Sequence, residues 1–319
     1  MTRREWPKRF HDRLSEPLPT MKDIVRLMRS GGFRPGKDQL AKGLEIPVEP
    51  NPALPSLRTD EAALTWVGHA STIIQAGGKT ILTDPIWTNG LPGRIPRLSP
   101  VGMPWESVGK VDGIVISHNH YDHLDHKTIK RLPKETPCFV PAALGRWFEK
   151  RGFTDVRELD WYESGMLGAV KVTCTPVHHW SRRTPWDTNA SLWGGWAFHA
   201  PGVDPIYFGG DTGYGTRFTE TRERLGSFGT AIMPIGAYDP QWFMACMHVN
   251  PEEAVQACAD LGAKRMLGIH WGTFPLTREP ILEPPVRARA AWVAAGRDEE
   301  DLWLPALGET KRVPPASRV

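Results

Sequence analysis

The segment SHNHYDH, residues 117–123, carries four side chains that can bind a metal ion: His118, His120, Asp122 and His123. It directly follows an apolar run over residues 113–116, which predicts a buried strand. Neutral nitrogen and anionic oxygen donors suit a borderline cation such as zinc, and one short loop can bring them together. The segment therefore predicts a metal site at the end of a strand, with a solvated histidine-rich turn as the alternative.

Three further candidate ligands, His179, Asp211 and His270, each occur where a predicted strand ends. Each is weak support alone, because a histidine at the end of an apolar run is more often a hydrogen-bonded core residue. Asp211 lies in the turn GGDTG, whose glycines let the backbone bend sharply and leave a carboxylate exposed. Together with segment 117–123, these residues occur in an order that one two-metal site could use. His178 directly precedes His179, so the residues alone leave open which of the two binds.

Predicted strands and helices alternate along the chain from about residue 60. The strands cover residues 64–67, 72–76, 80–83, 113–117, 170–175, 205–209, 231–235 and 265–269, and the helices cover 142–151, 251–261 and 286–295. This alternation predicts an α/β fold, and the sequence contains no repeat at solenoid or propeller spacing. Polar side chains that gather at strand ends from distant segments are typical of an active site built on rigid supports.

The chain of 319 residues is long enough for one large domain, which is the organisation we expect. Residues 1–60 are rich in proline and charge, and they predict an arm that packs on the core, with a helix over 21–29 and an extended stretch over 46–55. Residues 61–285 predict the main domain. Residues 286–319 predict a C-terminal helix and tail.

Composition and charge argue against several classes of protein. The formal net charge of +3 disfavours a dedicated nucleic-acid binder, which normally carries a clustered basic face. No apolar run approaches transmembrane length, and the basic segment 1–10 lacks the apolar stretch of a secretory signal. The four cysteines are scattered without a CxxC pair: Cys138, Cys174, Cys246 and Cys258. We therefore expect a cytoplasmic enzyme with reduced thiols, able to contact the inner membrane surface peripherally through its basic N-terminal segment.

Blocks of sequence around the candidate ligands resemble the metallo-β-lactamase superfamily, and specifically its branch of N-acylphosphatidylethanolamine-hydrolysing phospholipase D. The similarity spans about residues 60–285, and its blocks occur in family order: Trp66–Thr72, Thr83–Ile86, His179–Arg183, Leu192–Trp196, Gly210–Tyr214, His248–Ala254 and His270–Phe274. The resemblance implies a single-domain α/β fold, a four-layer αββα sandwich with an N-terminal arm. It also implies that the metal site lies at the edge where the two β-sheets meet.

The resemblance further implies two divalent metal ions. One ion would be bound by His118, His120 and His179, and the other by Asp122, His123 and His270. The carboxylate of Asp211 would bridge the two ions. His179 is favoured over His178 because the family's histidine directly precedes a tryptophan. Zinc is the expected metal, and iron and manganese are compatible with the same donors. A water shared by both ions would lose a proton and become a nucleophile.

Three more residues receive roles from the same resemblance. His248 corresponds to a family histidine near the substrate and could donate a proton or a hydrogen bond to the developing anion, or else simply precede a helix. Asp84 lies where the superfamily keeps an aspartate that supports the ligand loop, and His69 could help there or make a structural hydrogen bond. The predicted catalytic residues are Asp122, Asp211 and His248.

The resemblance implies phosphodiester hydrolysis, in which a metal-bridging hydroxide attacks an N-acylphosphatidylethanolamine-like phospholipid in the manner of a phospholipase D. A smaller, soluble phosphodiester is an open alternative, because the chain shows few signs of a dedicated membrane anchor. A lactonase or other carboxylic ester or amide hydrolase would use the same ligands, whereas a non-catalytic binding module would be expected to have lost one. An apolar groove for the substrate could be lined by the stretches around Trp180, Trp193, Trp196 and Trp242–Met244, with core packing as the default for most of these residues. A phosphate could be met by the basic pair Arg182 and Arg183, with a surface salt bridge as the alternative.

Overall fold

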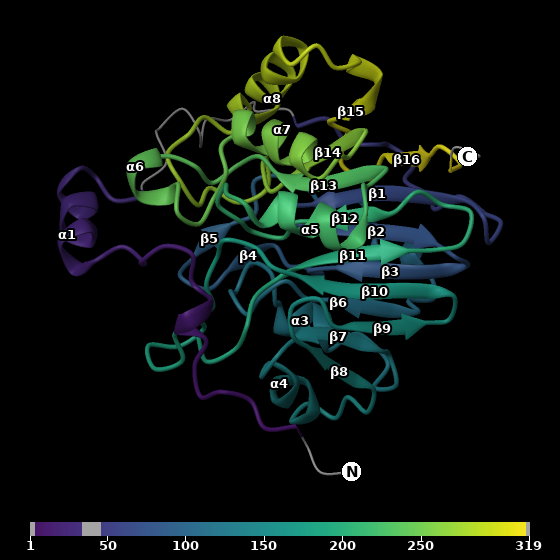
Figure 1. Cartoon of the computed structure of the whole chain (residues 1–319), viewed down its shortest axis with the longest axis horizontal. Coiled ribbons are helices and arrows are strands. Elements are labelled where there is room, and N and C mark those ends of the chain that lie inside the picture. Colours follow the sequence, from purple (N-terminus) through teal and green to yellow (C-terminus); the bar gives the residue numbers. More distant parts are fainter. Residues whose placement is uncertain (1–3, 34–45, 317–319) are drawn as a thin grey trace.

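Two seven-stranded β-sheets form the centre of the molecule in the computed structural model, which describes residues 4–33 and 46–316. The first sheet has the order β16 (Thr310–Val313), β1 (Ala62–Gly68), β2 (Ser71–Ala76), β3 (Lys79–Thr83), β6 (Gly113–Val115), β7 (Cys138–Pro141) and β8 (Val156–Leu159). The second has the order β15 (Leu302–Trp303), β14 (Arg265–Ile269), β13 (Thr230–Pro234), β12 (Ile206–Phe208), β11 (Gly195–His199), β10 (Val170–Thr175) and β9 (Ser164–Leu167). The sheets lie face to face (Figure 1), and β4 (Gly90–Leu91) and β5 (Ile95–Pro96) form a small separate hairpin.

Helices cover the outer face of each sheet. The α-helices are α1 (Met21–Arg29), α2 (Trp105–Val108), α3 (His126–Ile129), α4 (Gly145–Glu149), α5 (Arg217–Leu225), α6 (Gln241–Met244), α7 (Pro251–Asp260) and α8 (Glu283–Ala294), and two 3-10 turns cover His11–Arg13 and Glu299–Asp301. Helix α7 packs on β13 and β14 and contacts α5 and α8, whereas α4 packs on β8 of the first sheet. The layer order is therefore helix, sheet, sheet, helix, which confirms the predicted α/β sandwich.

Alternating side chains of the first sheet enter two different cores. In β1, Leu64 and Trp66 belong to the core between the sheets, whereas Val67 belongs to the core under α2, α3 and α4. In β2, Ile74 belongs to the core between the sheets and Ile73 belongs to the core under the helices. Successive side chains of a strand point to opposite faces, so a strand buried on both faces must be apolar at nearly every position. This is why these segments read as continuous apolar runs.

The residues that follow five of the strands lie at one edge of the sandwich. In the first sheet β3 and β6 are parallel, and in the second sheet β12, β13 and β14 are parallel. Strand β10 is antiparallel to β11, which is antiparallel to β12, so β10 runs in the same direction as β12. The candidate residues follow β3, β6, β10, β12 and β14: Asp84, His118, His179, Asp211 and His270. They gather because the carboxyl ends of these strands meet.

All eight strands predicted from the sequence are present, with bounds shifted by two residues at most. The predicted helix over 142–151 is shorter, because Ala143 has a φ of 66° and only residues 145–149 are helical. Helix α7 begins as predicted at Pro251, and it is capped by Asn250, whose side chain accepts a hydrogen bond from the Glu253 N–H. Strands β15 and β16 were not predicted, and they add the segment after α8 to an edge of each sheet.

The N-terminal segment runs over the surface of the sandwich. Phe10 is buried, Arg4 pairs with Glu163 at 2.6 Å, and Arg13 pairs with Asp160 at 3.1 Å. Helix α1 stands away from the body of the molecule (Figure 1). Of the predicted extended stretch over 46–55, Val48 forms a bridge with Leu307. The divisions near residues 60 and 285 stay predictions.

The helices of residues 4–33 and 46–316 include none that is both long enough and apolar enough to cross a bilayer. All four cysteines are free thiols, and Cys138, Cys174 and Cys258 are buried. Burial raises the pKa of the Cys258 thiol to about 12, so it stays protonated.

Candidate metal centre

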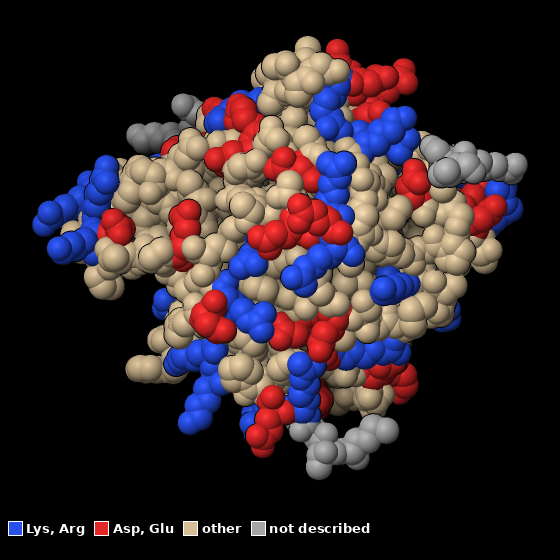
Figure 2. Space-filling model, viewed as in Figure 1, with Lys and Arg blue, Asp and Glu red and all other residues tan. Residues whose placement is uncertain are grey.

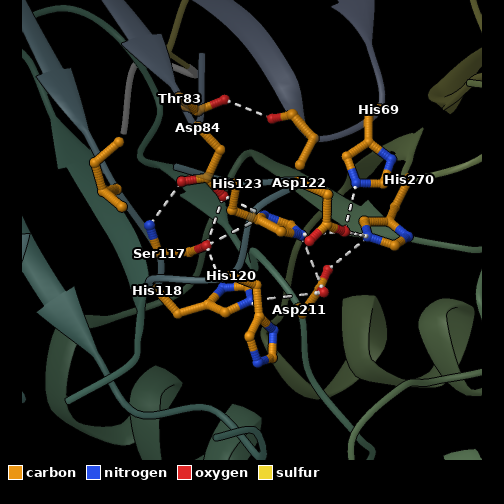
Figure 3. A network of polar contacts seen from close by, with 12 residues as sticks. His69, Thr83, Asp84, Ser117, His118, His120, Asp122, His123, Asp211 and His270 are labelled. Carbon is orange, nitrogen blue, oxygen red and sulfur yellow. Dashed lines mark hydrogen bonds and ion pairs between the residues drawn. The ribbon is translucent and has the colours of Figure 1, made fainter. Parts of the chain in front are cut away.

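The predicted ligands lie together at the edge where the carboxyl ends of both sheets meet, and Figure 3 labels all of them except His179. The first set is formed by three imidazole nitrogens. His118 Nε2 lies 2.7 Å from His120 Nδ1, and His179 Nε2 lies 3.4 Å from the same atom. Nitrogens at such distances cannot all carry protons, so a shared cation would satisfy them better than hydrogen bonds alone.

The second set combines one carboxylate with two imidazoles. Asp122 Oδ2 lies 3.5 Å from His123 Nε2 and 3.8 Å from His270 Nε2. All of these atoms lie within 4.8 Å of one another, together with the ring nitrogen of His69. This set could hold a second cation beside the first.

Asp211 lies between the two sets. Its Oδ2 atom is 3.0 Å from His123 Nε2 and 3.8 Å from His179 Nε2, and its Oδ1 atom is 3.1 Å from His270 Nε2. A carboxylate that reaches both sets is in the position that a bridging ligand requires.

Several of these atoms are buried without a hydrogen bond to any described residue: His123 Nε2, His270 Nε2 and Asp211 Oδ1. The close contacts with Asp211 fall within ion-pair distance but lack hydrogen-bond geometry. An unsatisfied buried polar group costs about 1–3 kcal/mol, so three in one cluster indicate that something else binds there. The residues present therefore fit a metal centre.

Asp84 fixes the ring orientation of two histidines. Its carboxylate accepts hydrogen bonds from the Ser117 N–H at 2.7 Å, from Ser117 Oγ at 2.5 Å and from His123 Nδ1 at 2.8 Å. Ser117 Oγ lies 2.9 Å from His118 Nδ1 and can accept its proton. In this network His118 and His123 both turn Nε2 toward the cluster, which is how supporting hydrogen bonds prepare metal ligands. Although burial opposes it, the Asp211 and Asp122 carboxylates raise the pKa of His123 well above its ordinary value, so a bound cation would displace a proton from that ring.

His179 and His69 have partners of their own. His179 Nδ1 lies 3.0 Å from the Met247 carbonyl oxygen and can donate to it, so its Nε2 is free to bind a cation. His69 Nε2 lies 3.0 Å from Asp122 Oδ2. Burial, aided by the nearby His270, lowers the pKa of His69 to about 3, so a neutral ring would donate its Nε2–H to Asp122. A hydrogen bond on the second nitrogen orients a ligating imidazole, and a donor to a ligating carboxylate orients that carboxylate.

Three residues of the centre have left-handed backbone, with φ values of 53° at His69, 36° at Asp84 and 63° at His270. Non-glycine residues rarely adopt this region, and where they do so they cluster at functional sites. The His270 N–H donates to the His69 carbonyl at 3.0 Å, which ties two of these bends together.

Burial and charge set the protonation of the cluster. Burial lowers the pKa of His120 to about 4 and that of His179 to about 3, so both rings are neutral at pH 7. Burial acts in the same direction on His270, but the Asp211 and Asp122 carboxylates outweigh it and raise the pKa of His270 to about 9. Binding of a cation beside these carboxylates would therefore displace a proton from His270.

A cavity of about 570 Å³ opens from the centre toward α1 and α6. Its polar lining includes four residues of the centre and one arginine: His120, Asp122, Asp211, His248 and Arg182. Most of the rest is apolar: Leu18, Ile24, Leu27, Met28, Phe33, Trp180, Phe243, Met244, Met247 and Leu276. His248 Nε2 lies 3.9 Å from Asp211 Oδ2, and its Nδ1 atom is buried without a hydrogen bond to the described residues. His248 thus faces both the ligands and the cavity.

The predicted tryptophan groove is formed only in part. The cavity is lined by Trp180, Phe243 and Met244. Trp193 and Trp196 are instead buried in the core and donate to the carbonyls of Val177 and Ile116. Trp242 lies exposed on α6. Sequence alone cannot separate these cases, because both environments favour a large ring with one polar atom.

The two arginines after His179 have different surroundings. Arg183 donates to the carbonyls of Asn119 at 3.1 Å and Leu124 at 2.8 Å, so it holds both sides of the ligand loop. Arg182 is exposed on the cavity wall and has no ion pair with a described residue. Sequence analysis missed the role of Arg183, since a contact with loop carbonyls leaves no pattern in the sequence.

His178 lies outside the ligand sets. Its backbone N–H donates to Thr212 Oγ1 at 3.1 Å, and its ring lies against Gly215. Sequence analysis also passed over the hydroxyl of Ser117 and the carbonyl of Met247. The position of Ser117 between a strand and the first ligand was a usable signal, whereas a backbone carbonyl gives none.

Comparison with known proteins agrees with this geometry. Residues 79–271 match the domain of the beta-lactamase superfamily. The chain belongs to this superfamily, in its metallo-β-lactamase form, and is a metal-dependent hydrolase. Within the superfamily it is a member of the branch that resembles N-acyl-phosphatidylethanolamine-hydrolysing phospholipase D.

Two relatives carry the name of that phospholipase. The chain is 38% identical over 238 residues to N-acyl-phosphatidylethanolamine-hydrolyzing phospholipase D 1 of Caenorhabditis elegans, a match that covers 69% of this chain and 67% of the relative. It is 34% identical over 260 residues to the mitochondrial enzyme of that name from Saccharomyces cerevisiae, covering 77% of this chain and 55% of the relative. An isothiocyanate hydrolase from Delia radicum gut bacteria has the same fold, with a TM-score of 0.65, 20% identity and coverage of 80% of this chain and 100% of its own.

Proposed function

We propose that this chain hydrolyses the phosphodiester of an N-acylphosphatidylethanolamine-like phospholipid, releasing an N-acylethanolamine and a phosphatidic acid. The observation that carries the proposal is the cavity, which joins the candidate ligands at one end to a wall of aliphatic and aromatic side chains suited to acyl chains. The names of the nematode and yeast relatives support the same substrate class. In the reaction the oxygen of water adds to phosphorus, the oxygen of the headgroup alcohol leaves, and that oxygen gains a proton.

The proposal includes two divalent ions, held in the two ligand sets on either side of Asp211. Bound there, they would lower the pKa of a water molecule to near neutrality and draw electron density from the phosphoryl oxygens. Zinc suits a centre made of imidazole and carboxylate donors, and iron and manganese are the alternatives. Asp122, oriented by the His69 N–H, and Asp211 supply the negative charge that such ions need.

Two cavity residues are proposed to handle the phosphodiester directly. The Arg182 guanidinium, without an ion pair among the described residues, is available to hold a phosphate oxygen. His248 is proposed to donate a proton or a hydrogen bond to the oxygen on which negative charge develops. Burial lowers the pKa of His248 to about 3, so the neutral ring would act through its N–H.

The test combines metal analysis with substrate assays on one preparation. The purified chain would be analysed for bound metal and assayed with N-acylphosphatidylethanolamine, bis(p-nitrophenyl) phosphate and a panel of lactones. About two metal ions per chain with cleavage of the phospholipid are expected. Cleavage of lactones alone would contradict the proposed substrate, and a chain that binds no metal would contradict the centre itself.

The bridging role of Asp211 gives a sharper test. Asp211→Ala should lose bound metal and activity together, because one carboxylate serves both ligand sets. His178→Ala is the matched control, since its ring lies outside those sets, and it should keep both. An Asp211→Ala variant with two metal ions and full activity would show that the assignment is wrong.

A further inference from the structure

Helix α1 presents an unusual number of apolar side chains to solvent. Met21 is 72% exposed, Met28 66%, Val25 43% and Ile24 39%, all within one helix of nine residues. Isolated apolar residues on a surface are ordinary, but a cluster on one short projecting element marks a surface for interaction.

The two sides of α1 face different surroundings. Ile24, Leu27 and Met28 line the cavity that leads to the metal centre. The other side of the helix lines an open hollow of the surface. This side carries Met21 and Val25 together with three basic residues, Lys22, Arg26 and Arg29. One helix thus links the apolar wall of the cavity to an outer surface that is apolar and basic.

The basic side chains of α1 have few partners. Lys22 and Arg29 form no ion pair with any residue in the described ranges, and Arg26 lies over the ring of Trp242 at 4.1 Å. The one acidic residue of the helix, Asp23, is used in a capping box with Thr20. Figure 2 shows these basic side chains gathered on the projecting end of the molecule, around α1.

Contacts at the C-terminal end of α1 hold the helix against the body of the protein. Arg278 Nε donates to the Gly32 carbonyl at 2.6 Å, and Arg278 Nη2 donates to Ser30 Oγ at 2.8 Å. Phe33 packs edge-on against Phe243 of α6, with ring centroids 5.6 Å apart. Helix α1 is therefore an exposed element with a fixed position relative to the cavity.

We propose that Met21, Val25, Trp242, Lys22 and Arg29 form a docking surface that binds the face of an anionic phospholipid bilayer. Met21, Val25 and Trp242 enter the interface while Lys22 and Arg29 contact lipid phosphates, as in other interfacial amphipathic helices. Charge selects this partner, because the outer side of α1 offers only cations and apolar groups. The inference rests on the proposed lipid substrate, since docking through α1 brings the cavity, which the other side of this helix lines, close to the bilayer.

This docking surface differs from the basic segment at residues 1–10, which was the membrane contact expected from the sequence. Arg4 is paired with Glu163, and Arg9 donates to the carbonyls of Thr188 and Trp186. These arginines are committed to the protein, whereas Lys22 and Arg29 are available. Helix α1 also precedes residues 79–271, which match the superfamily, so the part of the docking surface on α1 lies outside the matched domain, and Trp242 lies within it.

The apolar part of the proposal is tested by sedimentation of the full chain with large vesicles. Vesicles of phosphatidylcholine with about one third phosphatidylglycerol are expected to bind the chain, and pure phosphatidylcholine vesicles to bind it more weakly. Met21→Asp/Val25→Asp should weaken binding by about tenfold or more, because it removes two exposed apolar groups that would become buried in the bilayer interface. Val286→Asp is the matched control, a residue 68% exposed near the start of α8, and should bind as the parent does.

The basic part is tested with Lys22→Gln/Arg29→Gln, which should lose about fivefold in binding per charge removed, on anionic vesicles only. Circular dichroism would confirm that both double variants keep their fold. Binding that neither variant weakens, or an absence of binding, would overturn the proposal. The proposal would also be overturned if light scattering showed a dimer that Met21→Asp/Val25→Asp dissociates while vesicle binding stays unchanged. Helix α1 would then contact a second copy of the chain and not a bilayer.

Activity separates this inference from the proposed function. Met21→Asp/Val25→Asp should cleave a monomeric, short-chain phosphodiester at the parent rate and cleave the vesicle substrate at least about tenfold more slowly. Because vesicle binding is measured without turnover, a failure to cleave N-acylphosphatidylethanolamine would count against the proposed function and leave the docking result intact. If this variant cleaved the short-chain and the vesicle substrate more slowly by the same factor, the docking role would be overturned.

Discussion

At the scale of single residues, the centre depends on groups that never reach the cavity. Asp84 is fully buried and accepts hydrogen bonds from Ser117 and His123, and Ser117 in turn contacts His118. One carboxylate thereby sets the ring orientation of a histidine in each ligand set. The sequence predicted the position of Asp84, but the involvement of Ser117 depends on side-chain geometry.

Replacing this carboxylate should weaken metal binding without removing a ligand. Asp84→Asn keeps the size of the side chain but turns one acceptor into a donor, so His123 loses the partner of its Nδ1–H. We expect metal affinity to fall about tenfold to a hundredfold, measured by competition with a chromophoric chelator. Asp112→Asn, at a part-buried aspartate before β6, is the control and should keep the parent affinity. Unchanged affinity in Asp84→Asn would contradict this role.

His248 is expected to act on the substrate and not on the metal. His248→Ala should lower kcat by about a hundredfold or more, because the developing anion loses its donor, while the metal content stays at the parent level. Elemental analysis and initial rates on the same sample check both parts. Since His248 also lies within reach of His179 and Asp211, loss of metal in this variant would make it a ligand.

At the scale of elements, Arg183 joins the segment after β10 to the loop over residues 118–124. Besides its two bonds to loop carbonyls, its guanidinium lies 4.1 Å from the centre of the Tyr121 ring. A short loop that carries four candidate ligands needs such support, because its own backbone is not part of a sheet.

Arg183→Met should loosen this loop. We expect faster hydrogen exchange over residues 119–124 and metal affinity lower by about tenfold, since two carbonyls lose their donor. Arg182→Met is the matched control. It should leave exchange and metal affinity at parent values and instead raise KM for the phospholipid. If Arg182→Met loosened the loop and Arg183→Met did not, the assignment of the two arginines would be reversed.

The elements also mark where sequence reasoning succeeds. Strands such as β1 and β14 are buried on both faces, so each appears as an apolar run, and the ligands that follow β6 and β12 stand out by their chemistry. Strands β8 and β9 carry charged or small residues over Val156–Leu159 and Ser164–Leu167, and they were not predicted. These strands form through pairing with neighbours, which a single sequence does not display.

At the scale of the whole molecule, metal binding and proton binding oppose each other. The pKa of His270 in the metal-free fold is about 9, above its ordinary value, so its contribution to stability is complete below pH 6.5 and is lost as the pH rises through 9. His120 and His179 are neutral in the folded state, and above about pH 7.5 they are nearly neutral in the unfolded state too, so they add little slope there. The pKa of His123 is also raised, so His123 adds to the loss in the same direction as His270.

Chelation should therefore destabilise the chain increasingly at alkaline pH. We expect the melting temperature of EDTA-treated protein to fall between pH 6.5 and 9, with a loss on the order of 3 kcal/mol from His270. The metal-loaded protein should change less, because its ligands are already deprotonated. Calorimetry of the metal-loaded and the EDTA-treated protein checks this expectation. If the difference between their melting temperatures became smaller toward pH 9, the expectation would be wrong.

The pairing of β1 with β16 has a consequence for how the chain is made. Thr65 and Thr310 are hydrogen-bonded neighbours at 2.7 Å, although 245 positions separate them in the sequence. Strand β15 closes the other sheet in the same late region. Neither sheet can be completed during translation until residues 302–313 have left the ribosome, so until then β1 and β14 each have an unpaired edge, which is a site where a nascent chain can aggregate.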